Sequence, residues 1–160
     1  MPRHLARPDG RLRLGLLALA GLGIAGTAAE LGIERHWDSF EQLIPWAALL
    51  VAALALIGLV FRASTVTLWL ARIVAVALVA IATVGIWRHI HANFETAPLD
   101  FRYSERWETM SFFDQLRAAA GGAVGPAPVL ASGILAQVGL ALGLATIGLP
   151  ASGAGGDASA

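Results

Sequence analysis

Histidine and carboxylate side chains gather in two short segments of this 160-residue chain. Residues 30–41 contain Glu30, Glu34, His36, Asp38 and Glu41, and residues 89–95 contain His89, His91 and Glu95. Imidazole and carboxylate ligands suit zinc, copper(II), manganese or ferrous iron, whereas the absence of cysteine argues against copper(I). The residue types therefore allow a divalent metal site, for which the candidate ligands are His36, His89, His91, Glu30, Glu34 and Glu95.

The spacing of these residues sets conditions on such a site. Glu30 and Glu34 lie four residues apart and face the same way if their helix continues past its apolar part. His89 and His91 lie two residues apart, so their side chains diverge on a helix and converge only on an extended segment. A second interpretation, which the sequence favours, is that both clusters are polar residues at a membrane boundary, joined by hydrogen bonds and ion pairs. In that case the chain needs no cofactor.

Several other chemistries are disfavoured by what the sequence lacks. It has no Gly-rich phosphate loop, no HExxH motif and no Ser/His/Asp order. Without cysteine it forms no disulfide, thiolate nucleophile or iron–sulfur cluster, and its histidines lie at the edges of the apolar stretches, where they would not face one another across a haem. The 11 arginines balance the 11 acidic residues, so no basic surface attracts nucleic acid. We therefore predict a protein that is not an enzyme and has no nucleic-acid partner.

The composition is that of a membrane protein, since 57% of the residues are hydrophobic, 14% are charged and the mean hydropathy is +0.69. A helix needs about 20 apolar residues to cross the hydrocarbon core. Four stretches qualify, at residues 14–31, 44–61, 66–87 and 129–149. The predicted fold is all-α, a polytopic membrane protein with four transmembrane helices in an antiparallel bundle. Only residues 62–65 join the second and third spans, which predicts a helical hairpin.

Charged residues beside the first span predict the orientation. Arg3, Arg7, Arg11 and Arg13 precede this span, so the positive-inside rule puts the Arg-rich tail of residues 1–13 in the cytoplasm. An even number of spans returns the flexible tail of residues 150–160 to the same side. The absence of lysine and the abundance of Ala, Leu and Gly are typical of a GC-rich bacterium, which indicates a bacterial inner membrane.

The first span also has the pattern of a cleavable signal peptide. Thr27, Ala28 and Ala29 are small residues of the kind found at a cleavage site. The apolar run nevertheless continues past Glu30 to Ile33, which is longer than most signal cores. We therefore expect the span to be retained.

The outer loop between the third and fourth spans, residues 88–125, is too long for a plain connector. Ser111 and Asp114 have the spacing of a helix N-terminal cap, and Phe112 and Phe113 begin an apolar face, which predicts a short interfacial helix. We expect the loop to act as a lid over the outer end of the bundle, with a docking surface for a partner as the alternative. The aromatic rings expected at the headgroup level on this side are Trp37, Trp46, Trp87, Trp107 and Tyr103.

Few polar or small residues interrupt the spans. Gln137 is expected to hydrogen-bond to another helix, and Arg72 is expected to extend its side chain to the headgroups. Gly139 and Gly143 have the GxxxG spacing that lets helices approach closely, and we expect them to pack within the chain.

Three segments resemble one known family. They are GIERHWDSFEQLIPW at residues 32–46, HIHANFE at residues 89–95 and LASGILAQVGL at residues 130–140. Together they resemble a family of uncharacterised bacterial four-helix integral membrane proteins, over roughly residues 14–150. The resemblance implies no activity, but it implies a shared fold with matching residues at His36, His89, Asn93, Glu95, Gly133 and Gln137. The chain departs from the family pattern at three positions. The family usually has an acid where this chain has Ala97, a proline at Ser132 and a histidine at Leu149. The missing acid and histidine weaken any metal site that would use them.

These observations predict a non-enzymatic integral inner-membrane protein, structural or accessory to a membrane assembly. Its partners would be the lipid bilayer and another membrane protein, which would bind the outer loop or the Gly/Ala helix faces. The alternative is a metal- or small-ligand-binding membrane protein that uses the His and carboxylate cluster on the outer, periplasmic face. We expect the neighbourhoods of His36 and His89 to meet in the bundle, because both follow spans that rise in the same direction.

Overall fold

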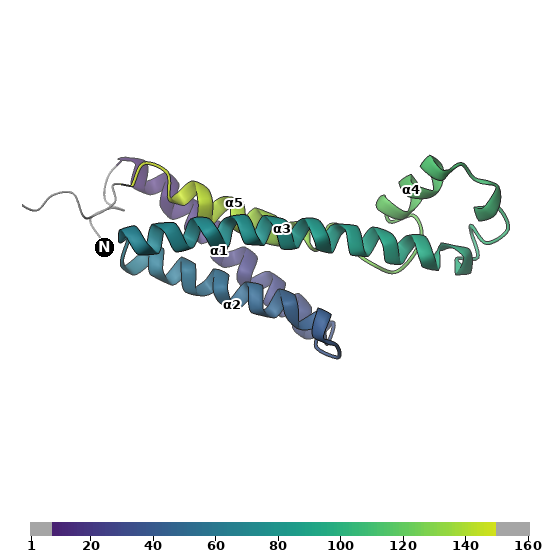
Figure 1. Cartoon of the computed structure of the whole chain (residues 1–160), viewed down its shortest axis with the longest axis horizontal. Helices are drawn as coiled ribbons and strands as arrows, with labels where there is room; N and C mark the ends of the chain where they lie inside the picture. The colour runs from purple at the N-terminus through teal and green to yellow at the C-terminus, as the bar shows by residue number, and fades with distance from the viewer. Residues whose placement is uncertain (1–7, 150–160) are drawn as a thin grey trace, which may run out of the picture. The chain divides into compact units, whose positions relative to one another are not determined.

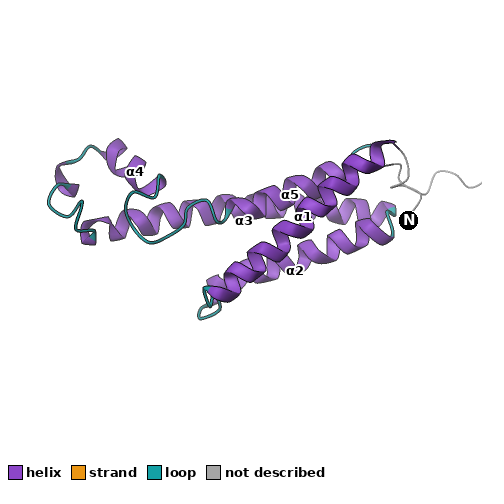
Figure 2. Cartoon of the chain, turned by 180° about the vertical axis from the view of Figure 1, so that it is seen from behind, coloured by secondary structure: helices purple, strands orange, loops and turns teal. Residues whose placement is uncertain are grey.

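The computed structural model describes residues 8–149, which are largely helical and contain no strand (Figures 1 and 2). The all-α prediction is therefore confirmed for the described part of the chain. The helices are α1 (Pro8–Ile33), α2 (Phe40–Phe61), α3 (Thr65–Thr96), α4 (Phe112–Ala120) and α5 (Gly133–Ala145), with short 3-10 turns at Ala97–Leu99 and Trp107–Thr109. The predicted tail of residues 150–160 lies outside the described residues.

The chain divides into two compact units, which we describe separately. The first, here called the span unit, comprises the described residues up to 81 and from 135 onward. It contains α1, α2, the first part of α3 and nearly all of α5. The second, here called the loop unit, comprises residues 82–134 and contains the rest of α3, both 3-10 turns and α4.

Three helices are long and apolar enough to cross a membrane, namely Gly10–Ile33 of α1, α2 and the segment Thr65–Leu99 that begins with α3. This supports a membrane location. The helix in the predicted fourth span is shorter, because α5 has 13 residues and is about 20 Å long, against about 30 Å for the hydrocarbon core. Residues 129–132 form turns before it, and a turn with Gly148 at a φ of +71° follows it. The described structure therefore supports three spans and does not establish a fourth.

The predicted hairpin of α2 and α3 is present (Figure 1). Residues 62–64 connect the two helices, and the Ser64 hydroxyl accepts a hydrogen bond from the Thr67 N–H at 3.2 Å, which caps the start of α3. Gly58 of α2 lies so close to α3 that a Cβ atom on it would be 2.8 Å from the Thr67 Cγ2 atom. A small residue at position 58 therefore allows the two helices to meet at the turn.

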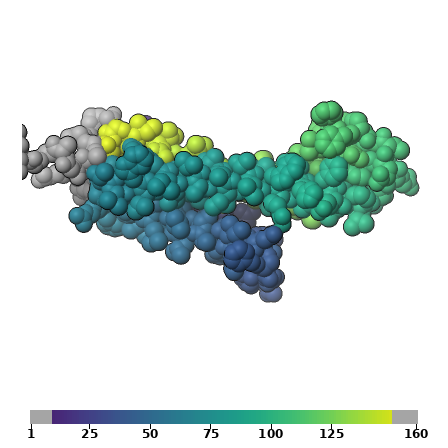
Figure 3. All heavy atoms as spheres, in the orientation of Figure 1, coloured from purple at the N-terminus to yellow at the C-terminus, as the bar shows by residue number. Residues whose placement is uncertain are grey.

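Glycine also allows α5 to pack closely on α3. A Cβ atom on Gly139 would lie 2.7 Å from the Ala75 carbonyl oxygen, and one on Gly143 would lie 3.4 Å from the Ala75 Cβ atom. In Figure 3 the yellow surface of α5 lies directly against the teal surface of α3. The prediction that Gly139 and Gly143 pack within the chain is confirmed. Gln137, in contrast, is exposed, so the expected bond to another helix stays a prediction.

The loop unit begins with a correction to the predicted end of the third span. Residues 88–96 were expected in a loop, but α3 continues to Thr96 and ends just before Pro98. The apolar run stops at Trp87, yet the next nine residues contain neither glycine nor proline and can continue the backbone hydrogen bonds. The predicted short helix is present as α4, and Ser111 caps it by accepting from the Asp114 N–H at 3.2 Å.

The loop unit has a small hydrophobic core of its own. The side chain of Trp107, 3% exposed, packs with four buried residues, which are Ala97, Ala118, Ala119 and Val124. The Phe94 ring meets the Trp107 ring edge-on, with 5.2 Å between the ring centroids. Trp107 was expected at the headgroup level, but it is the central core residue of this unit.

We predict that Gly139→Ala destabilises the span unit whereas Gly26→Ala does not. The new Cβ atom at position 139 would meet the Ala75 backbone, and overpacking of this kind typically costs about 1–3 kcal/mol. Gly26 has no atom within 4 Å of the added Cβ position, and alanine favours a helix. Thermal unfolding in detergent measures both variants. Equal melting temperatures for the two would contradict the close packing of α5 on α3.

Candidate functional site

Three of the six predicted metal ligands, Glu30, Glu34 and His36, lie in the span unit, at the end of α1. The Glu34 N–H donates to the Glu30 carbonyl at 2.9 Å, so the last helical turn reaches Glu34. Arg35 then adopts a left-handed φ of 50°, and the His36 N–H donates back to the Leu31 carbonyl. The condition for Glu30 and Glu34 to share a face is therefore met.

The other three predicted ligands, His89, His91 and Glu95, lie on α3 within the loop unit. The His89 Nδ1 atom is 2.8 Å from the Pro128 carbonyl oxygen, whereas the His91 Nε2 atom is 3.2 Å from a Glu95 carboxylate oxygen. Because α3 is helical through this segment, His89 and His91 have different partners. The extended segment that would bring them together is not formed.

No group of three or more His, Asp or Glu side chains that could hold a metal ion is found among the side chains described, those of residues 10–149. The six candidates divide between the span unit and the loop unit. A joint metal site, and the meeting of His36 with His89 that it requires, stay predictions.

Asn93 is the buried polar residue that organises the loop unit. Its side chain is 0% exposed, and its Nδ2 atom donates to the carbonyls of Ala119 at 3.2 Å and Ala127 at 2.9 Å. Its Oδ1 atom accepts from the Ala127 N–H at 2.8 Å. One amide therefore joins α3 to the end of α4 and to the segment that follows α4. Gly125, with a φ of +74°, lets that segment pass close by, since a Cβ atom there would be 2.6 Å from the Asn93 Cα atom.

Sequence reasoning identified Asn93 only through the family resemblance. Asn93 is the only asparagine in the chain, and it lies between apolar residues on a helix that precedes a Gly- and Pro-rich segment. A single amide in that position indicates hydrogen bonds between the helix and the loop, because buried amides require partners.

A second set of hydrogen bonds closes the loop unit through Asp100 and Arg102. The Arg102 guanidinium donates two hydrogen bonds to the Asp100 carboxylate, at 3.0 and 2.7 Å, and a third to the Ala123 carbonyl at 2.9 Å. Hydrogen bonding by the Arg102 side chain and backbone lowers the pKa of the Asp100 carboxyl below its ordinary value of 3.8. This pair therefore ties the turn after α3 to the segment that follows α4.

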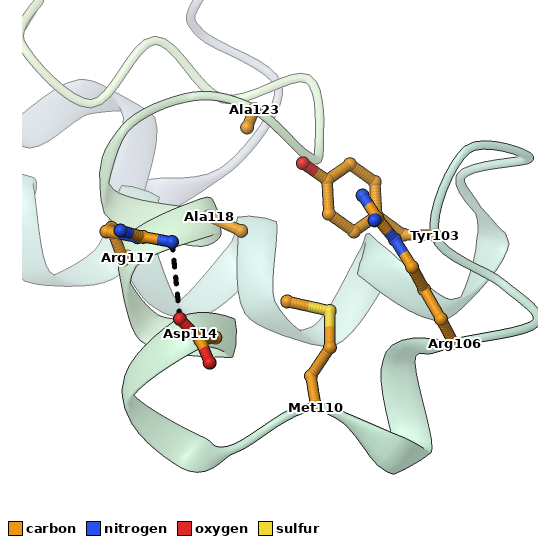
Figure 4. A pocket seen from close by; sticks show the side chains of 7 residues that line it. All are labelled: Tyr103, Arg106, Met110, Asp114, Arg117, Ala118 and Ala123. Carbon is orange, nitrogen blue, oxygen red and sulfur yellow. Dashed lines mark hydrogen bonds and ion pairs between the residues drawn. The ribbon is translucent and has the colours of Figure 1, made fainter.

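The loop unit forms an open pocket of about 380 Å³ (Figure 4). Its lining residues are Tyr103, Arg106, Met110, Asp114, Arg117, Ala118 and Ala123. Figure 4 shows Arg106 and Arg117 on opposite sides, with the Met110 thioether between them.

One of the two guanidinium groups in the pocket has no carboxylate partner among the described residues. Arg117 is paired with Asp114, with 3.2 Å between the nitrogen and the carboxylate oxygen. The guanidinium carbon of Arg106 lies 4.3 Å from the centroid of the Tyr103 ring. Within the part of the chain that the structure describes, no carboxylate contacts Arg106. The pocket is therefore suited to an anionic group.

Comparisons with protein-family models, curated proteins and solved structures find no match to this chain. The resemblance to a family of bacterial four-helix membrane proteins thus stays a prediction. What the structure supports is a class, an all-helical chain with three helices able to cross a membrane and a folded loop unit.

We predict that Asn93→Ala opens the loop unit. It would leave the Ala127 N–H and the Ala119 and Ala127 carbonyls without their partner, at a cost of about 1–3 kcal/mol for each buried group left unsatisfied. Hydrogen exchange in residues 119–127 should rise while exchange in α2 stays unchanged. His91→Ala is the matched control on the same helix, because its exposed pair with Glu95 contributes little. Full protection of residues 119–127 in Asn93→Ala would contradict this role.

We also predict that the stability contributed by Asp100 depends on pH. Because the folded pKa is below the unfolded one, the contribution is complete above about pH 4 and is lost as pH falls through the lowered folded pKa. Wild-type protein should therefore melt at a higher temperature than Asp100→Asn near neutral pH, and the two should converge in strong acid. Thermal unfolding of both proteins across this pH range measures the difference. A difference that does not change with pH would exclude the ionised pair as its source.

Proposed function

We propose that this chain is a non-enzymatic integral membrane protein that serves as an accessory subunit of a membrane assembly. In this role the loop unit binds a partner protein by receiving an acidic group in the pocket of Tyr103, Arg106, Met110 and Arg117. The observation that carries the proposal is this pocket, which is built on a fixed core and contains a guanidinium without a carboxylate partner among the described residues.

The length of α3 supports a position outside the hydrocarbon for its polar C-terminal part. At 1.5 Å per residue, its 32 residues extend about 48 Å, which is about 18 Å more than the hydrocarbon core. No charged residue occurs between Arg72 and Arg88, so this stretch fits the core of the bilayer. The polar part of α3 after Arg88 would then lie beyond it. With the orientation expected from the arginines near the N-terminus, that side is the periplasm of a bacterial inner membrane.

The residue types in the pocket support binding to a protein. Tyrosine, methionine and arginine are enriched at protein interfaces and are frequent among the residues that contribute most to affinity. A guanidinium held over an aromatic ring is already oriented, and it can bind a carboxylate through two parallel hydrogen bonds. The lining contains no Ser, Cys or His, and its one carboxylate, Asp114, is paired with Arg117, so we propose binding rather than catalysis.

Exposed aromatic rings on the loop unit offer apolar contacts to a partner. Phe101 is 87% exposed, and Phe112 and Phe113 at the start of α4 are 62% and 79% exposed. A docking surface would present such rings to a partner. The lid interpretation stays a prediction.

Site-specific crosslinking in the native cell tests the proposal. A photoreactive amino acid in place of Met110 should crosslink to one protein of defined mass, and a second substitution, Arg106→Ala, should reduce that product about tenfold, as expected for loss of one charge-assisted contact. The same photoreactive group in place of Glu95, which is not in the pocket lining, is the positional control. Crosslinks to lipid alone, or a protein product unaffected by Arg106→Ala, would reject the proposed role.

A further inference from the structure

Two arginines from different helices meet at the C-terminal end of α5 in the span unit. Arg13 of α1 donates from Nε to the Ala145 carbonyl at 2.8 Å and from a terminal nitrogen to the Ile147 carbonyl at 3.0 Å. Arg72 of α3 donates from Nε to the Thr146 hydroxyl at 3.1 Å and from a terminal nitrogen to the Thr146 carbonyl at 3.4 Å. Because their acceptors are three consecutive residues, the two guanidinium groups are held within one turn of backbone.

This arrangement satisfies the end of α5 but concentrates positive charge. The last carbonyls of a helix lack partners within the helix, and cations there also interact favourably with the helix dipole. The contacts of Arg72 are neutral, namely Thr146 and the Trp69 ring at 5.6 Å. Among residues 10–149, whose side chains the structure describes, no carboxylate contacts Arg72. The guanidinium of Arg72 therefore favours binding of an anion.

An apolar groove begins at Arg72 and follows the surface between α3 and α5. Its volume is about 510 Å³, and it is lined by Arg72, Ala75, Val76, Val79, Ala80, Gly139, Leu140, Gly143, Leu144 and Ile147. From Arg72 to Ala80 the groove extends about 12 Å along α3. Alanine and glycine at its base make it hollow, and Arg72 is its single charged lining residue. The groove is thus charged at one end and apolar along its length.

We infer that this groove binds an anionic phospholipid, with the phosphate group at Arg72 and one acyl chain along α3 and α5. The charge distribution of the groove matches that of the lipid, whose anionic headgroup is followed by apolar chains. Basic pockets between membrane helices on the cytoplasmic side are suited to anionic headgroups, and the orientation expected from the sequence puts Arg13 and Arg72 on that side. Any apolar surface in a bilayer contacts acyl chains, so the groove is distinguished by its selectivity for a charged headgroup.

Lipid retention by the purified full-length protein tests this inference. Native mass spectrometry after mixing with phosphatidylglycerol and phosphatidylcholine should show preferential retention of phosphatidylglycerol. Arg72→Gln keeps a donor for Thr146 but removes the charge, and it should weaken phosphatidylglycerol binding about tenfold. Arg62→Gln is the matched control, because Arg62 is an exposed arginine outside the groove lining, and it should retain the preference.

A second variant keeps the test informative if Arg72→Gln does not fold. Val76 is 71% exposed and lines the groove, so Val76→Trp fills the path of the acyl chain while leaving both arginines in place. It should reduce phosphatidylglycerol retention, whereas Val84→Trp, at an exposed position of α3 outside the lining, should not. Equal retention of the two lipids by the wild type, or unchanged selectivity in Arg72→Gln, would overturn the inference. A lipid-free dimer that Val76→Trp disrupts would instead identify a second copy of the chain as the occupant.

Discussion

Helices satisfy their own backbone hydrogen bonds, so in an apolar environment the groups that still need partners are those at helix ends and in the segments that follow. In this chain a few long polar side chains supply those partners. The guanidinium groups of Arg13 and Arg72 bind the carbonyls that end α5, and the amide of Asn93 binds the backbone at both sides of the turn after α4. Each unit therefore depends on polar groups that reach across from another helix.

The same constraint explains why α5 can be short. The last carbonyls of this 13-residue helix have no partners within the helix unless other side chains reach them. Arg13 and Arg72 do so from α1 and α3, and Gly139 lets α5 approach α3 closely enough for these contacts. Close packing and end capping thus support each other, and neither depends on a span of full length.

Much of the span unit could be predicted from the sequence because lipid imposes a simple rule, about 20 apolar residues for each crossing. The hairpin at residues 62–64 and the helix capped by Ser111 also followed from local patterns. The continuation of α3 to Thr96 could not be read from hydropathy, because a helix does not end where its apolar run ends. Hydropathy also did not show that α5 begins only at Gly133, because the turns at residues 129–132 are as apolar as the helix.

The candidate site was harder to predict because it depends on contacts between distant residues. Histidine and carboxylate types drew attention to His36 and His89, yet the bonds that organise the loop unit come from Asn93 and Arg102. Nothing in local spacing shows that Asn93 will meet Ala127, 34 residues later.

The side chains best suited to bind a partner or ligand are charged groups that the structure orients and that contact no group of opposite charge. His91 and Glu95 satisfy each other on an exposed helix face, and His89 is bonded to a backbone carbonyl, so these residues are already explained by local structure. Arg106 and Arg72 differ, because each is oriented by an aromatic ring and contacts no carboxylate within the described part of the chain. Arg106 belongs to an open pocket and Arg72 to an apolar groove. An oriented cation beside an open space retains its capacity to bind an anion, and that capacity distinguishes these two arginines from the histidines.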